Sequence, residues 1–112
     1  APELCTFIVP ATVHRGAVKI AISTGGASPA LARHLRRQVE QIIGPEYAVL
    51  ADILAGLRPR LRAGLPDSST RAQVIRSLLA SDLLAVITAE GPEAGRAYAR
   101  ALLDNLIQRH GG

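Results

Sequence analysis

The sequence predicts an α+β fold, in which a short β-hairpin and a helix precede a wholly helical region. Residues 6–13 are rich in β-branched and apolar side chains, and residues 17–22 alternate apolar and polar ones, as strands do. From residue 29 onward, apolar side chains recur at spacings of three and four residues, which is the helical period. We therefore expect two regions, residues 1–44 with the hairpin and first helix, and residues 45–112 with helices only.

The two expected strands are joined by His14-Arg15-Gly16, a short connector whose glycine can adopt a positive φ. Pro10 cannot donate a ladder hydrogen bond, so it belongs at an edge, a bulge or a bend of the first strand. Because an isolated two-stranded hairpin is marginal in water, we expect these strands to extend another sheet in the same molecule or in a partner subunit. A homodimer is therefore expected, with the hairpin and the following helix in its interface.

Local signals indicate where each helix begins and ends. Ser28-Pro29 supplies an N-cap hydroxyl and a proline at the first helical position, and this helix should end at Gly44. Its expected apolar stripe consists of Leu31, Leu35, Val39 and Ile42. A second helix should open at Pro45 and break near Leu57, because Pro59 cannot continue it. Three more helices are expected, one capped within residues 67–70, a short one over residues 81–88, and a last one over residues 92–109.

Composition narrows the classes of partner. The net charge is +4, and twelve of the thirteen basic residues are arginine, whose planar fork of donors matches carboxylates and phosphates. A polycarboxylate, a nucleotide and nucleic acid all fit that bias, but only three aromatic residues are present, which disfavours single-stranded nucleic acid. Cys5 is the single cysteine and no zinc-like spacing of Cys and His exists, so we expect no metal site and a reducing, cytoplasmic setting. No apolar run approaches the length of a membrane span.

The segment between the second strand and the first helix is a candidate anion-binding turn. It contains Ser23, Thr24, Gly25 and Gly26 and leads to Ser28 at the helix N-terminus. Glycines let backbone N–H groups approach a ligand closely, and a helix N-terminus adds partial positive charge. However, the segment lacks both the P-loop ending and the three-glycine dinucleotide fingerprint, so spacing alone favours an ordinary strand-to-helix turn.

Three stretches resemble siroheme synthase, the precorrin-2 dehydrogenase/sirohydrochlorin ferrochelatase family. They are Phe7-Ile8-Val9-Pro10-Ala11, His14-Arg15-Gly16 and Ile22-Ser23-Thr24-Gly25-Gly26-Ala27-Ser28-Pro29-Ala30-Leu31-Ala32. The resembling region of that family follows its nucleotide-binding domain, forms its dimerisation segment and continues into a helical C-terminal part. From Pro45 onward, only the helical layout and the length resemble the family.

This resemblance implies that the parent enzyme oxidises precorrin-2 to sirohydrochlorin with NAD bound in an N-terminal Rossmann domain, and that bifunctional members insert ferrous iron as a substrate. It implies tetrapyrrole contacts from the turn, with Arg15 as a further candidate for binding the substrate carboxylates. The candidate substrate-binding residues are Ser23, Thr24, Gly25, Gly26, Ser28 and Arg15. Some members carry serine at the position of Thr24. The family's acid–base aspartate and its NAD fingerprint have no counterpart here, so we expect no catalytic and no cofactor-binding residues in this chain, and no dehydrogenase activity from it alone.

A second interpretation is a small basic helical module that binds nucleic acid or a protein partner. Arg58, Arg60 and Arg62 form a run that suits acidic partners, although such runs are more often solvated surface. The two interpretations differ in what binding depends on. A nucleic-acid reader should weaken steeply with salt and tolerate changes in residues 24–26, whereas a tetrapyrrole site should depend on that turn.

Overall fold

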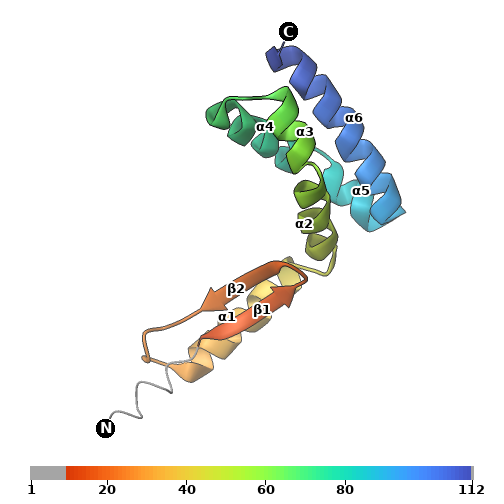
Figure 1. Ribbon diagram of the computed structural model, residues 1–112. Coiled ribbons are helices and arrows are strands. Elements are labelled where there is room, and N and C mark those ends of the chain that lie inside the picture. The colour runs from red at the N-terminus through yellow and green to blue at the C-terminus, as the bar shows by residue number, and fades with distance from the viewer. Residues whose placement is uncertain (1–9, 112) are drawn as a thin grey trace. The chain divides into compact units, whose positions relative to one another are not determined.

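A computed structural model describes residues 10–111, which form two antiparallel strands and six helices (Figure 1). The elements are β1 (Ala11–Arg15), β2 (Val18–Ile22), α1 (Pro29–Ile42), α2 (Glu46–Gly56), α3 (Arg58–Gly64), α4 (Ser68–Ala80), α5 (Leu83–Glu90) and α6 (Pro92–Gly111). The predicted α+β class is confirmed. Contacts divide the chain into two compact units, with the division between Ala48 and Val49, inside α2. Cys5 and residues 6–9 of the expected first strand lie outside the described residues.

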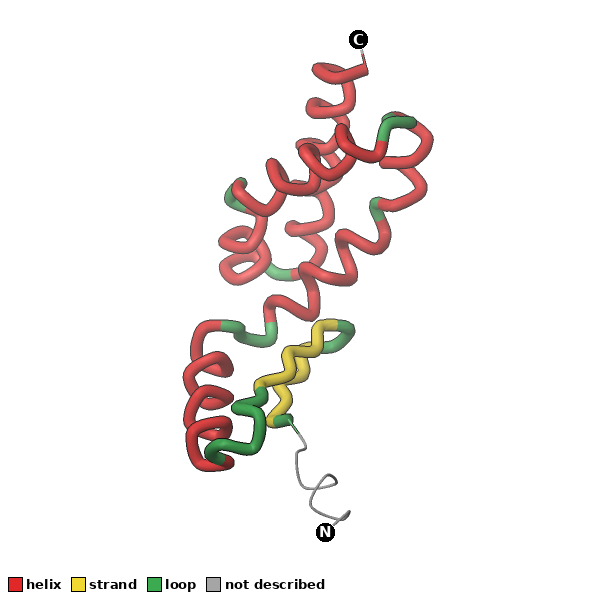
Figure 2. Tube along the Cα trace, turned by 90° about the vertical axis from the view of Figure 1, so that its left-hand side faces the viewer, coloured by secondary structure: helices red, strands yellow, loops and turns green. Residues whose placement is uncertain are grey.

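The first unit is a hairpin packed on one helix. Strands β1 and β2 pair from Ala11 opposite Ile22 to Arg15 opposite Val18, and Figure 2 shows α1 lying along one side of them. Val13 is 1% exposed and is the best buried residue of the hairpin. The alternation of inward and outward side chains seen in residues 18–22 of the sequence is therefore the pattern of a sheet with one covered face.

The expected hairpin connector, His14-Arg15-Gly16, was wrong in its first two residues. His14 and Arg15 belong to β1, where they pair with Lys19 and Val18, and the turn is made by Gly16 and Ala17. Gly16 has a φ of +60°, and a Cβ at this position would lie 2.9 Å from that of Ala48. The glycine is thus required both for the backbone conformation and for the close approach of the next segment.

Helix α1 begins as predicted. Ser28 is extended, its Oγ accepts a hydrogen bond from the backbone N–H of Leu31 at 3.1 Å, and Pro29 occupies the first turn. The apolar stripe expected along this helix is not its buried side, since Ala32 is the residue of α1 that the hairpin covers. Three members of the stripe are exposed by 47%, 38% and 71%: Leu31, Leu35 and Ile42.

The second unit is helical throughout. Helix α6 packs against α3, α4 and α5, and the core contains Val74, Leu78, Leu83 and Leu103, each at most 1% exposed. The break predicted at Pro59 is confirmed, because α2 ends at Gly56 and α3 carries the proline in its first turn. The cap expected before α4 is also confirmed.

That cap is Asp67, whose Oδ2 accepts hydrogen bonds from the backbone N–H and the hydroxyl of Thr70, both at 3.0 Å. The short helix α5 starts and ends two residues later than expected, and α6 continues to Gly111. In residues 10–111 no single helix is long and apolar enough to cross a membrane; α4 and α5 reach that length and composition only together, across a 46° bend.

Candidate functional site

The turn between β2 and α1 is a tight reversal built on two glycines. The backbone N–H of Ala27 donates to the carbonyl of Thr24 at 3.1 Å, which closes a four-residue turn. Gly25 and Gly26 at its centre have φ angles of +66° and +82°, a combination found in type I′ turns. Both glycines are exposed. The sequence pattern Gly-Gly therefore has a local conformational cause, independent of any ligand.

The three hydroxyls of the turn bind its own backbone. Thr24 Oγ1 donates to the carbonyl of Ser28 and accepts from the N–H of Ser28, both at 3.1 Å. Ser23 Oγ accepts from the N–H of Gly25 at 3.2 Å, and Ser28 Oγ caps α1 through Leu31. Since the proton of Thr24 is committed to Ser28, its hydroxyl holds the turn in shape rather than offering a donor to a carboxylate.

Several donors of the turn make no hydrogen bond within the described residues. The hydroxyls of Ser23 and Ser28 act only as acceptors within the described residues, so each retains a proton to donate. The backbone N–H groups of Gly26 and Ala30 have no partner among the residues that the structure describes. These four groups lie where β2 passes into the N-terminus of α1, whose dipole favours an anion. Carboxylate oxygens accept hydrogen bonds from donors of both kinds, hydroxyl and backbone N–H.

Arg15 is not part of this cluster. Its Nε donates to the carbonyl of Ile43 at 2.8 Å, and its Nη atoms donate to the carbonyls of His14 and Glu40 at 2.9 and 3.4 Å. The side chain therefore joins the end of β1 to the C-terminal end of α1, where unpaired carbonyls attract a cation. The turn residues stand at the opposite end of this 14-residue helix, which is roughly 21 Å long. The structure thus separates Arg15 from the other predicted site residues.

A cavity in the second unit was not anticipated from the sequence. Its volume is about 400 Å³, and it is lined by Asp52, Ile53, Gly56, Leu57, Arg96, Ala97 and Arg100. The sequence shows that Arg96 and Arg100 lie one turn apart on a helix. It does not show that they face α2, because that arrangement depends on how the helices pack. Within residues 10–111, no three His, Cys, Asp or Glu side chains come together as metal ligands.

The turn after β2 lies within a part of the chain that matches a known protein family. Residues 15–42 match the family model for the sirohaem biosynthesis protein central segment. The chain is 36% identical over 112 residues to a siroheme synthase of Thioalkalivibrio sulfidiphilus, which aligns 99% of this chain with 23% of that protein. It is 47% identical over 70 residues to a siroheme synthase of Methylococcus capsulatus, covering 62% of this chain and 15% of that one. The chain thus spans less than a quarter of the length of these curated relatives.

A solved structure shows the same fold. The chain matches SirC, precorrin-2 dehydrogenase, with a TM-score of 0.57 and 22% identity, over 89% of this chain and 46% of that one. At this identity the match concerns the fold alone. The sequence matches confirm the resemblance to siroheme synthases that the motifs of residues 7–32 predict.

Proposed function

We propose, from the relationship of this chain to a segment of the siroheme synthases, that it is the dimerisation and tetrapyrrole-contacting part of a siroheme-biosynthesis enzyme. The complete enzyme would oxidise precorrin-2 to sirohydrochlorin with NAD in the cytoplasm, and a bifunctional form would take ferrous iron as a second substrate. The observation that carries this proposal is the glycine turn at the start of α1, with its free donors, inside the family-matched residues 15–42.

The tetrapyrrole contact is supported by the chemistry of those donors. Precorrin-2 and sirohydrochlorin carry eight carboxylates, and a carboxylate can accept from the N–H groups of Gly26 and Ala30 and from the hydroxyls of Ser23 and Ser28. Thr24 supports this set indirectly, because its hydroxyl sets the path of the backbone from β2 into α1. Charge-assisted hydrogen bonds of this kind are about twice as strong as neutral ones.

The dimer is supported by the apolar row on α1. Leu31, Leu35 and Ile42 lie at helical spacings of four and seven and remain exposed in the described residues. Removing apolar surface from water stabilises an association by about 25 cal/mol per Å², and each of these side chains still exposes more than a third of its surface. A second copy of the chain would cover this row on both subunits at once, as a two-fold interface does.

The NAD cofactor does not fit the residues described here. Dinucleotides bind at the carboxyl ends of parallel strands, where a glycine-rich turn leads into a helix. The sheet described in residues 10–111 has two antiparallel strands, and the turn after β2 lacks the three-glycine pattern. Hydride transfer by the complete enzyme would therefore require a nucleotide-binding domain outside these residues.

Titration with sirohydrochlorin tests the tetrapyrrole contact. Gly25→Val should weaken binding at least tenfold, because valine resists a φ of +66° and obstructs the approach of a ligand to the turn. Gly91→Val is the matched control, since Gly91 also has a positive φ and open space around it but lies at the end of α5. Equal affinity of the wild type and a folded Gly25→Val variant would contradict the proposed contact.

Sedimentation tests the dimer separately. Leu35→Glu should shift the equilibrium toward monomer, because it places a charge in the proposed apolar interface. Leu79→Glu on α4 is the control, since Leu79 is similarly exposed, by 51%, and lies in the other unit. A wild-type chain that stays monomeric well above micromolar concentration would refute the dimer without affecting the tetrapyrrole test.

A further inference from the structure

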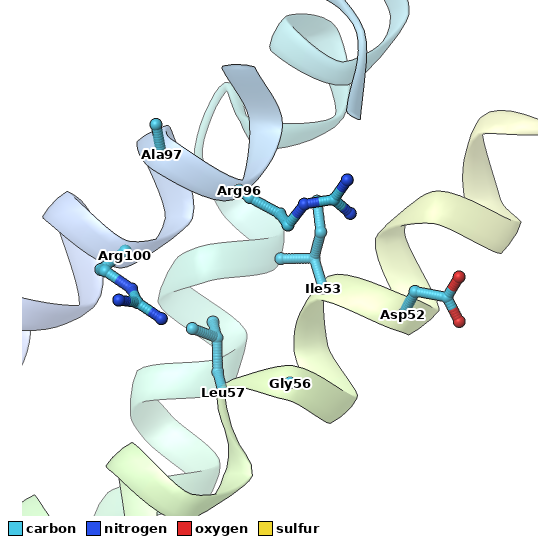
Figure 3. A pocket seen from close by; sticks show the side chains of 7 residues that line it. All are labelled: Asp52, Ile53, Gly56, Leu57, Arg96, Ala97 and Arg100. Atoms are coloured by element: carbon cyan, nitrogen blue, oxygen red, sulfur yellow. The ribbon is translucent and has the colours of Figure 1, made fainter. Parts of the chain in front are cut away.

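A groove between α2 and α6, within the second unit, combines an apolar floor with two cationic side chains (Figure 3). Ile53 and Leu57 form the floor and are 3% and 5% exposed. In Figure 3, Arg96 and Arg100 extend from α6 over this floor toward α2. The cavity volume of about 400 Å³ is within the range of small-molecule sites.

Both arginines lack an acidic partner. Arg96 and Arg100 are one helical turn apart, and neither makes an ion pair within the residues described. Asp104, one turn further along α6, would be the natural partner of Arg100. It is instead bound by Arg60, whose Nη2 lies 2.8 Å and Nε 2.9 Å from Asp104 Oδ1. The groove therefore presents two positive charges without an ion-pair partner beside an apolar surface.

Asp52 on α2 is the one acidic residue in the lining, and it forms no ion pair with either arginine. Its carboxylate repels an anion placed on the α2 side of the groove. Negative groups of a ligand would consequently lie on the α6 side. Gly56 lines the groove next to the floor, and a Cβ added there meets no atom within 4 Å, so this wall is open.

We propose that this groove is a binding site for a small molecule that carries two carboxylates on an apolar body. Each guanidinium offers a planar fork of donors to one carboxylate, and the body of the ligand packs on Ile53 and Leu57. Such a molecule has two sources: two carboxylate arms of the tetrapyrrole considered above, or a separate aromatic or aliphatic dicarboxylate. The site lies in the second unit, and the observations that support it do not involve the turn after β2.

Calorimetric titration of the 112-residue chain with isophthalate, an aromatic dicarboxylate, tests the site. Arg96→Gln and Arg100→Gln should each lower the affinity about tenfold, because each removes one charge-assisted contact. Arg76→Gln is the control, since Arg76 is exposed on α4 and outside the groove but carries the same charge. Asp52→Asn should raise the affinity, and Gly56→Leu should abolish binding by filling the groove while leaving every charge in place.

Isophthalamide, which has the same ring without charge, should bind at least tenfold more weakly than isophthalate. The proposal is overturned if isophthalate does not saturate the chain at millimolar concentration, if Arg76→Gln weakens it as much as Arg100→Gln, or if isophthalamide binds equally well. Sirohydrochlorin then identifies the source. Loss of its affinity in Arg96→Gln and Arg100→Gln assigns the groove to tetrapyrrole arms, and unchanged affinity in both assigns it to a separate dicarboxylate.

Discussion

Thr24→Val separates a turn-forming role of this hydroxyl from a substrate contact. The Thr24 hydroxyl makes two hydrogen bonds to the backbone of Ser28, and valine has the same shape without either bond. The carbonyl of Ser28 keeps a second donor, the N–H of Ala32 at 3.1 Å, so it stays satisfied. The N–H of Ser28 loses its acceptor in a part-buried position. The expected loss of unfolding free energy is therefore about 1 to 2 kcal/mol, mostly from that single donor.

Urea unfolding measures the loss of unfolding free energy for the whole chain, and amide hydrogen exchange measures the loss of protection at Ser28 itself. Exchange at the Ser28 amide should accelerate about tenfold in Thr24→Val, because 1.4 kcal/mol corresponds to a factor of ten. Thr24→Ser keeps the hydroxyl and should change both quantities much less. If Thr24→Val preserved the stability and the Ser28 protection of the wild type but lost affinity for sirohydrochlorin, the hydroxyl would be a ligand contact and the reasoning from the turn would fail.

Three further substitutions test the packing, the cap and the hairpin turn. Gly95→Ala should lower the unfolding free energy by about 1 kcal/mol in urea, because its Cβ would lie 2.5 Å from Ile87 Cγ1 and the crowding exceeds the gain in helix propensity. The backbone N–H of Thr70 holds the pKa of Asp67 below its ordinary value of 3.8, so the stabilisation is complete above that value and is lost as pH falls through the lowered pKa. Thermal melts from about pH 5 to about pH 2 should accordingly decline less steeply for Asp67→Asn than for the wild type. Gly16→Val should abolish amide protection in β1 and β2, since valine resists a φ of +60° there; retained protection would contradict the strain argument.

The turn after β2 and the exposed apolar row on α1 have separate roles in the proposed function. Gly25 and Gly26 reverse the chain so that the free donors lie at the start of α1, and the same helix presents Leu31, Leu35 and Ile42 on its surface. A change in the turn is thus expected to affect ligand affinity, whereas a change in the row is expected to affect assembly. The two sets of variants should be separable by experiment.

The sequence by itself determined the features whose causes are local. Ser28-Pro29 starts a helix and Asp67 caps another because the groups that bond lie within one turn of each other. Pro59 interrupts a helix through its own ring, and glycines at turns are required by the backbone path. The motif of residues 22–32 likewise needed no packing information to indicate the family.

The tertiary structure decided which distant residues meet. Arg15 was expected in the hairpin connector as a candidate contact for substrate carboxylates. The register of β1 with β2 and the packing of α1 instead bring it to the carbonyl of Ile43, away from the other predicted site residues. The pairing of Arg60 with Asp104, which leaves Arg100 without an acid, likewise depends on the contact of α3 with α6. Helical periodicity shows which residues share a face of one helix, but the apposition of two faces follows from the packing of the whole unit.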